Sequence, residues 1–451
     1  MTKKPKLSFW QIWNLSFGFL GVQFGFALQN ANVSRILSNL GADPNNLSLF
    51  WLAAPIMGLI VQPIVGGASD HTWNRLGRRF PYILGGAIIS VLAMFFMPNS
   101  AIVTAIMPPL VFGAIMMALM DGSFNVTFQP FRSLVSDMLP EEQKNVGYSI
   151  QSFLINVGSV LGSVLPYILT NWFGVNNTAA EGHVPDSVIW SFYIGGAVLM
   201  LTVLVTIFTT KEYTPEQMKE FATENNEEKS QSENKSEGLI SLIKNAPKIM
   251  WQLAVVQFFA WFALYLMWTY TTSAVAQHYW GTEISDTKSE AFNEAGNWVG
   301  IIFGAYGVFA ALFALCMPKL IKLFSRKIVY AAALACGGLG FISMIIFTDP
   351  NMLIISMIGI GIAWAAILAL PFAILSSSLP QEKTGVYLGI FNFTVSVPQI
   401  VSGLVGGVIL KYAFNSQSIK ILVLCGVSMI LGSIFALTLK DKQNQESEKS
   451  K

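Results

Sequence analysis

The sequence carries little charge for its length. Only 12% of its 451 residues are Asp, Glu, Lys or Arg, whereas about 25% is usual for a soluble domain. Hydrophobic residues make up 53% of the chain, and the mean hydropathy is +0.55. A soluble enzyme is therefore excluded, and a membrane protein is indicated. The formal net charge of +2 provides no basic surface for nucleic acid, so we expect a lipid bilayer and no nucleic acid as a partner.

Cysteine and histidine are also scarce. The three cysteines are Cys316, Cys336 and Cys425, and the three histidines are His71, His183 and His278. The cysteines lie in apolar runs without Cys-x-x-Cys spacing, which excludes a disulfide framework or a zinc site. An intramembrane enzyme would need His, Asp or Cys clustered on a cavity, but the histidines fall in predicted loops. We therefore expect no metal, no cofactor and no enzymatic activity.

What the sequence does contain is a series of long apolar stretches. A hydrocarbon core about 30 Å thick is crossed by a helix of roughly 20 residues. Twelve stretches of this kind follow one another, at 9–34, 47–69, 80–97, 102–135, 146–170, 188–210, 249–276, 297–317, 328–347, 351–376, 384–410 and 419–439. The sequence therefore predicts an all-α membrane protein with twelve transmembrane helices.

The basic residues predict the orientation of these helices. Most Lys and Arg fall in segments that share one side of the membrane if both termini do. The exceptions are Arg35, Lys288, Lys411 and Lys420, on the opposite side, and Arg132, inside a predicted span. Because Lys and Arg concentrate on the cytoplasmic side, we expect a cell-membrane protein with cytoplasmic N- and C-termini.

The chain divides into two similar halves. Residues 211–248 are rich in Glu and Lys and predict a solvated cytoplasmic linker between a first bundle, 1–210, and a second, 249–451. Within 130–148 the sequence runs Pro-Phe, then Leu-Pro, then Val-Gly-Tyr, and within 371–387 a similar order recurs with Gly-Val-Tyr. Two pseudo-symmetric six-helix bundles of this kind resemble major facilitator transporters, whose ligand binds between the halves near mid-membrane.

One acidic residue stands out because it lies where charge is costly. Of the 25 acidic residues, only Asp121 falls in the middle of a predicted span. An aspartate at a helix centre costs about 2.5 to 3.5 kcal/mol on insertion scales, so such residues usually face a polar cavity and serve a function. The alternative is a packing role in which Asp121 accepts hydrogen bonds from neighbouring helices. We favour a role in transport.

Two further polar residues share the helical face of Asp121. Asn125 and Arg132 project within about 40° of it at 100° per residue. Arg132 is nevertheless about 16 Å away along the helix, too far for an ion pair. A carboxylate without a permanent cationic partner in a poorly hydrated site gains affinity for protons, which suits a proton carrier. Arg132 either contacts the ligand or extends to the inner interface.

The second half has aromatic residues where the first half has charge. Trp261, Tyr265 and Trp268 have i, i+4 and i+7 spacing, which places them on one helical face. Sugar C–H faces stack on indole, and sugar hydroxyls pair with amides and carboxylates. The candidate sugar ligands among the amides are Gln29, Asn125, Gln151, Asn392 and Gln399. Aromatic residues at helical spacing also serve packing, and that alternative stays open.

Four stretches resemble the plant sucrose–proton symporters and their animal and bacterial sugar-transporting relatives, within the glycoside-pentoside-hexuronide symporters. They are residues 24–29, 51–79, 121–132 and 389–399. The resemblance implies that Asp121 binds the proton and contacts the sugar, and that Arg132 is needed for coupling. It also implies a cytoplasmic gate motif made of Asp70, Arg75, Gly77, Arg78 and Arg79, although positive charge there also serves orientation.

Two departures limit this resemblance. The plant symporters have charged residues that matter for transport near the start of the eighth span, whereas here that region reads Glu294-Ala295-Gly296-Asn297-Trp298-Val299. The sugar or its coupling therefore differs from theirs. Sodium-linked melibiose carriers have aspartates in the second span, and residues 47–69 contain none. Sodium coupling is therefore disfavoured.

These observations predict a monomeric, proton-coupled importer of a neutral sugar, an α-linked disaccharide such as sucrose or maltose. The predicted ligands of the sugar are Asp121, Asn125, Gln29, Gln151, Asn392, Trp268, Tyr265 and Gln399. The coupling ion is expected to be H+, bound at Asp121. The alternatives are sodium-coupled or facilitative sugar transport, or a sugar sensor that does not transport.

Overall fold

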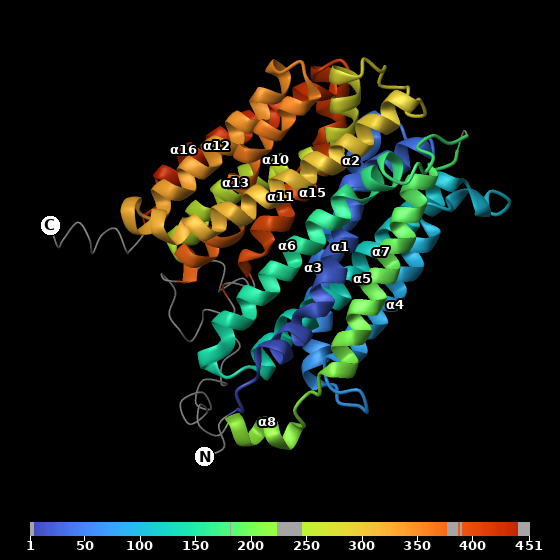
Figure 1. Ribbon diagram of the computed structural model, residues 1–451. Helices are drawn as coiled ribbons and strands as arrows, with labels where there is room; N and C mark the ends of the chain where they lie inside the picture. The colour runs from blue at the N-terminus through green and yellow to red at the C-terminus, as the bar shows by residue number, and fades with distance from the viewer. Residues whose placement is uncertain (1–3, 181, 223–245, 377–386, 388–389, 441–451) are drawn as a thin grey trace.

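The chain folds into helices throughout the part that the structure describes. This computed structural model describes residues 4–180, 182–222, 246–376, 387 and 390–440 (Figure 1). The first bundle contains α1 (Phe9–Asn39), α2 (Leu47–Phe50), α3 (Ala53–His71), α4 (Phe80–Phe96), α5 (Pro109–Met138), α6 (Glu141–Asn171) and α7 (Asp186–Thr209). Helix α1 packs against α6 and α7, and α4 packs against α5.

The second bundle follows a short helix, α8 (Pro215–Ala222), in the predicted linker. It contains α10 (Lys248–Tyr279), α11 (Glu290–Phe324), α12 (Arg326–Ile346), α13 (Leu353–Ser376), α15 (Phe393–Val408) and α16 (Ser418–Leu437). Short turns are η1 (Pro44–Asn46), η2 (Ser100–Val103), η3 (Pro350–Met352) and the π-helical η5 (Ile409–Ala413). Helix α16 packs against α10 and α12, and α13 against α11 and α12. Two bundles of helices therefore lie side by side, as predicted.

The number of membrane-crossing segments agrees with the sequence. Ten helices of the described part are long and apolar enough to cross a membrane. Helix α4 is apolar but has only 17 residues, and α1, with 31 residues, is rich in polar side chains. With these two helices the described chain has the predicted twelve segments. Residues 211–248 separate the spans of the first bundle from those of the second. Of these residues, 223–245 lie outside the described part of the chain.

Several helices extend beyond their predicted apolar stretches. The first span was predicted to end at residue 34, but α1 continues to Asn39. The eighth was predicted at 297–317, but α11 runs from Glu290 to Phe324. At the end of α1 and the start of α11 the helix continues through polar residues, because their side chains form hydrogen bonds within the protein. Residues 384–386 and 388–389 of the eleventh predicted span lie outside the described residues.

Glycines allow α1 and α6 to approach closely, which fixes the position of the helix that carries Gln29. A Cβ on Gly158 would lie 2.2 Å from the backbone oxygen of Leu20, and one on Gly162 would lie 2.5 Å from that of Phe24. Small residues at helix crossings are typical of membrane bundles, where close packing replaces the hydrophobic effect. The N-terminus of α1 is fixed by a capping box between Ser8 and Gln11.

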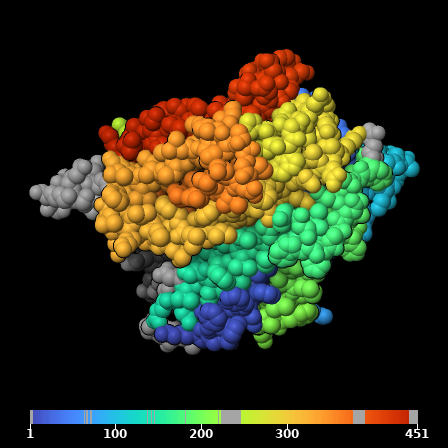
Figure 2. Space-filling model, turned by 45° about the horizontal axis from the view of Figure 1, so that its top comes forward, coloured from blue at the N-terminus to red at the C-terminus, as the bar shows by residue number. Residues whose placement is uncertain are grey.

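The two halves meet at one end of the molecule, which we call the far end. It lies opposite α8, where α1 and α10 end and α11 begins, and α2 marks it in Figure 1. Ser34 Oγ donates to the Thr269 carbonyl at 2.8 Å, Tyr265 Oη donates to the Ser48 carbonyl at 2.5 Å, and Ser416 Oγ donates to Asn45 Oδ1 at 3.0 Å. Helices α6 and α11 also pack together, and the second bundle lies against the first in Figure 2. These contacts close the far end.

Candidate functional site

The site is centred on Asp121, in the interior of α5. The side chain is only 2% exposed, and Gln29 of α1 donates its amide N–H to Oδ1. The second carboxylate oxygen, Oδ2, has no hydrogen-bond partner among the described residues, and neither has Gln29 Oε1. Buried polar atoms are nearly always paired in folded proteins. The unpaired oxygens therefore make Asp121 and Gln29 candidates for holding a proton and a polar ligand.

Asn125, one turn further along α5, joins a third helix to this site. Its Nδ2 donates to the backbone oxygen of Asp121 at 2.8 Å, and its Oδ1 accepts from Gln62 Nε2 of α3 at 2.6 Å. Helices α1, α3 and α5 are thus joined at Asp121, with Gln29 on its carboxylate, Asn125 on its backbone oxygen and Gln62 on Asn125. Gln62 was not among the predicted ligands of the sugar. Its only signal in the sequence was an amide within an apolar span.

Two other predicted residues of the first half lie apart from this cluster. Gln151 of α6 is 5% exposed, and its Nε2 has no partner among the described residues. Arg132 is exposed, with its guanidinium carbon 5.4 Å from the centre of the Phe128 ring, a cation–π contact. The structure therefore does not join Arg132 to Asp121, in agreement with their separation along the helix. The predicted role of Arg132 in coupling stays a prediction.

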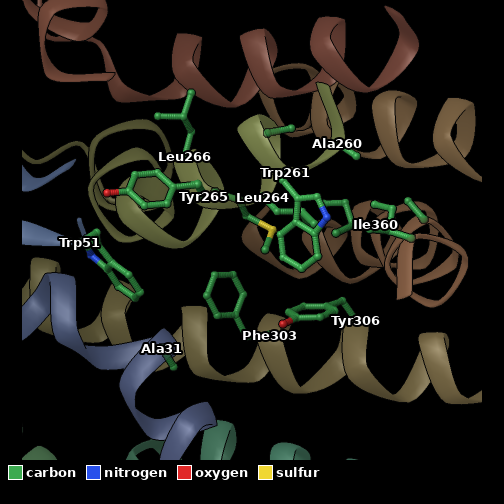
Figure 3. Packing of buried hydrophobic residues seen from close by; sticks show 14 of the residues in the cluster. Ala31, Trp51, Ala260, Trp261, Leu264, Tyr265, Leu266, Phe303, Tyr306 and Ile360 are labelled. Atoms are coloured by element: carbon green, nitrogen blue, oxygen red, sulfur yellow. The ribbon is translucent and has the colours of Figure 1, made fainter. Parts of the chain in front are cut away.

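An aromatic cluster of four residues lies in the second half: Trp261 and Trp268 of α10, Tyr306 of α11 and Trp364 of α13. The ring centres of Trp364 lie 5.9 Å from Trp261, 5.8 Å from Trp268 and 6.4 Å from Tyr306, all near-perpendicular. Figure 3 labels Trp261 and Tyr306 in this part of the core. The indole N–H of Trp261 has no hydrogen-bond partner among the described residues, whereas that of Trp268 is directed at Tyr306. The cluster therefore offers apolar faces together with a free donor.

The remaining predicted ligands have different surroundings. The Tyr265 ring is buried, and its hydroxyl is occupied by the Ser48 carbonyl of the first half. Tyr265 thus lies at the boundary between the halves. Asn392 is exposed at the start of α15, and Gln399 is partly buried within it. These three predicted positions do not form one contact cluster.

The predicted gate motif forms a compact charged loop between α3 and α4. Arg78 and Arg79 both pair with Asp137 Oδ2 of α5, at 2.5 and 3.0 Å, and Arg79 Nη1 donates to Ser69 Oγ at 2.6 Å. Gly77 has φ +116°, which favours glycine. Arg75 is exposed, and the side chain of Asp70 lies outside the described residues.

Glu212, just after α7, holds this loop from the other side. Its carboxylate accepts from the backbone N–H groups of Arg78, Arg79 and Phe80 at 2.9–3.1 Å. Burial raises the pKa of the Glu212 carboxyl, and these three N–H groups oppose that shift. Sequence reasoning missed Glu212 and Asp137, because an acid at the end of an apolar span looks like an ordinary interfacial residue. Across the described residues, no His, Cys, Asp and Glu side chains gather in a group able to hold a metal ion.

Two helical bundles with a buried carboxylate near their boundary define a multi-pass membrane transporter. The sequence model of the Major Facilitator Superfamily matches residues 15–285 and 284–451, and the chain belongs to that family. It is a transporter and not an enzyme. The chain is 25% identical to the sucrose transport protein SUT5 of Oryza sativa subsp. indica over 470 residues, which cover 92% of this chain and 85% of the relative.

Two other proteins are informative. The general alpha-glucoside permease of Schizosaccharomyces pombe is 29% identical over 165 residues, 34% of this chain and 30% of the relative. The crystal structure of the nucleoside transporter NupG matches with a TM-score of 0.69 at 14% identity, over 95% of this chain and 99% of that one. The sequence matches confirm the resemblance to plant sucrose transporters, and the structural match confirms the fold.

Proposed function

We propose that the protein imports a neutral sugar together with protons, and that the sugar is an α-linked disaccharide such as sucrose or maltose. The observation that carries the proposal is Asp121, buried at mid-helix with one carboxylate oxygen held by Gln29 and the other unpaired. The names of the sucrose transport protein and the alpha-glucoside permease support the class of substrate.

In this proposal, Asp121 couples the proton to closure of the site. An ionised carboxylate is costly wherever it loses contact with water, so a closed site favours the protonated acid. The protonated acid also gains an O–H donor for a sugar hydroxyl, while its second oxygen remains held by Gln29. Binding of both ligands then favours the closed state by their differential affinity for it. The two halves alternate around the site, as in other transporters of this family.

The two halves contribute different chemistry to the sugar. On the first half, Gln29 holds the carboxylate of Asp121, Asn125 holds its backbone oxygen and Gln62 pairs with Asn125, and these amides orient hydroxyl groups. On the second half, the aromatic cluster supplies indole faces for stacking and the unpaired N–H of Trp261 for a sugar oxygen. Such a site selects a neutral, hydroxyl-rich ligand with apolar C–H faces.

The placement in the cell belongs to the same proposal. Because most Lys and Arg lie in segments on the same side of the membrane as the termini, both ends of the chain are cytoplasmic, the far end faces outward and the protein lies in the cell membrane. The loop of Arg78 and Arg79 then lies on the cytoplasmic side.

The test is uptake into vesicles that contain the purified protein. Labelled sucrose and maltose are offered with and without a pH gradient and a protonophore. We expect accumulation driven by the pH gradient, and we expect Asp121→Asn to abolish accumulation while exchange across the membrane continues. Asp186→Asn, an exposed acid of the same half, is the matched control. Undiminished accumulation by Asp121→Asn refutes the proposal, uptake driven by sodium or without any gradient favours the alternatives, and absence of flux favours a sensor.

A further inference from the structure

A fully buried arginine lies between the halves at the far end. Arg35, in the last turns of α1, is 0% exposed. Its Nε donates to Asn293 Oδ1 at 2.9 Å, its Nη1 to Asn297 Oδ1 at 2.8 Å and its Nη2 to Asn177 Oδ1 at 2.7 Å. Asn293 and Asn297 belong to α11 of the second half, whereas Asn177 precedes α7 in the first half. The guanidinium therefore spans the boundary.

The partners of this charge are all neutral. No carboxylate pairs with Arg35 in the part of the chain that the structure describes. A buried charge is strongly unfavourable unless hydrogen bonds replace its hydration. Amide oxygens carry only partial charge, so the closed state needs all three of them to hold the guanidinium.

The surrounding contacts fix the three acceptors in place. Asn293 Nδ2 donates to the Ser289 backbone oxygen at 3.1 Å. Asn297 Nδ2 donates to Thr170 Oγ1 at 3.0 Å, and Ser187 Oγ donates to Asn177 Oδ1 at 2.7 Å. Helix α11 passes directly over the guanidinium, because a Cβ on Gly296 would lie 2.6 Å from Arg35 Cδ. The amide oxygens are therefore already oriented when the far end closes on the Arg35 guanidinium. No water fits between Arg35 and α11 at Gly296.

We propose that Arg35, Asn177, Asn293 and Asn297 form an arginine latch that closes the far end, and that the buried charge sets how readily this end opens. Two of the three acceptors lie on α11, so a movement of α11 away from α1 removes both at once and returns the guanidinium to water. The latch is a two-state element: it is dry and fully hydrogen-bonded when closed, and hydrated when open. It makes no contact with the Asp121 site and acts without sugar.

The latch predicts that losing an acceptor and losing the charge have opposite outcomes. Asn297→Leu leaves Nη1 buried without a partner, so we expect the open population to rise about ten- to a hundredfold. Arg35→Met removes the charge and its desolvation while keeping most of the apolar stem, so the far end stays closed. The double variant Arg35→Met/Asn297→Leu returns to the closed state because no charge is left to be stranded.

The experiment measures distances between spin labels in the purified full-length protein, without sugar. The labels are placed at Ile106 and Glu283, exposed loop positions of the two halves at the far end, after replacement of the three native cysteines. We expect a longer distance for Asn297→Leu, and the closed distance for Arg35→Met and for the double variant. Asn171→Leu is the control, because it makes the same change at an exposed asparagine of α6 that does not contact Arg35.

An unchanged distance for Asn297→Leu overturns the latch, and so does a double variant as open as Asn297→Leu alone. Should Asn297→Leu fail to fold, Arg35→Lys against Arg35→Met decides the question. Lysine keeps the charge without the planar fork that reaches three acceptors, so it opens the far end if the latch is right. Equal distances for the two variants overturn it. Because the readout is conformational, these results are independent of which sugar or ion is transported.

Discussion

Glu212 provides a sharp test of how the first half is held together at the loop between α3 and α4. Its carboxylate accepts four hydrogen bonds from three backbone N–H groups, at 2.9, 2.9, 3.0 and 3.1 Å. Two of these groups, on Arg79 and Phe80, are at the start of α4, where helical N–H groups lack partners within the helix. Replacement by alanine leaves all three without an acceptor.

The expected magnitude follows from these contacts. A hydrogen bond to a charged group contributes about 1.5–3 kcal/mol, and 1.4 kcal/mol corresponds to a factor of ten in an equilibrium constant. We therefore expect Glu212→Ala to accelerate amide hydrogen exchange at Arg78, Arg79 and Phe80 by about ten- to a hundredfold. Glu212→Gln keeps one acceptor oxygen, so its rate of amide exchange should lie between those of wild type and Glu212→Ala.

The assay is hydrogen exchange followed by mass spectrometry on peptides that cover residues 74–84. Glu220→Ala removes an exposed acid from the adjacent α8 and serves as the matched control, with no expected change. Exchange at 78–80 that is equal in Glu212→Ala and wild type would show that these N–H groups are held by something other than the carboxylate, and the reasoning would fail.

Three further predictions concern packing, binding and pH. Gly158→Ala drives a Cβ into the backbone oxygen of Leu20, so it should cost about 1–3 kcal/mol and lower the melting temperature, whereas Gly85→Ala, with open space around it, should not. Trp261→Phe keeps an aromatic ring but loses the free N–H, so the Kd for the sugar should rise about fivefold in a fluorescence titration; an unchanged Kd places the sugar elsewhere. The raised pKa of Glu212 means that the folded protein holds this proton more tightly than the unfolded chain. The stability of wild type relative to Glu212→Gln should therefore be largest near pH 4 and decline as the pH rises through that pKa; a thermal-unfolding difference that grows toward pH 7 contradicts the sign.

The sequence reveals those features that depend on local composition. Asp121 was identifiable because one charge interrupts an apolar stretch, and the twelve segments were identifiable because hydropathy is a property of short windows. The pairing of Gln62 with Asn125 was not identifiable from the sequence, because it depends on how α3 and α5 lie in space. The same holds for Glu212, whose partners are backbone groups that carry no sequence signal.

Arg35 shows how a boundary error hides a residue. Sequence reasoning ended the first span at residue 34 and therefore assigned Arg35 to the outer surface. The structure places it inside α1 and buries it. Arg35 and its polar neighbours Ser34, Ser38 and Asn39 look like loop sequence, but their partners lie on α10, on α11 and in the connection between them. Hydropathy cannot distinguish a polar helix end in water from one buried against a second bundle.

The chemistry of the far end has a consequence for how the transporter responds to its medium. The contacts between the two bundles there join hydroxyls, amides and backbone carbonyls, and the buried guanidinium of Arg35 lies among them. Dissolved ions weaken attraction between exposed charges but have little effect on dipoles and sealed groups. Closure at the far end should therefore depend little on the ionic strength of the medium.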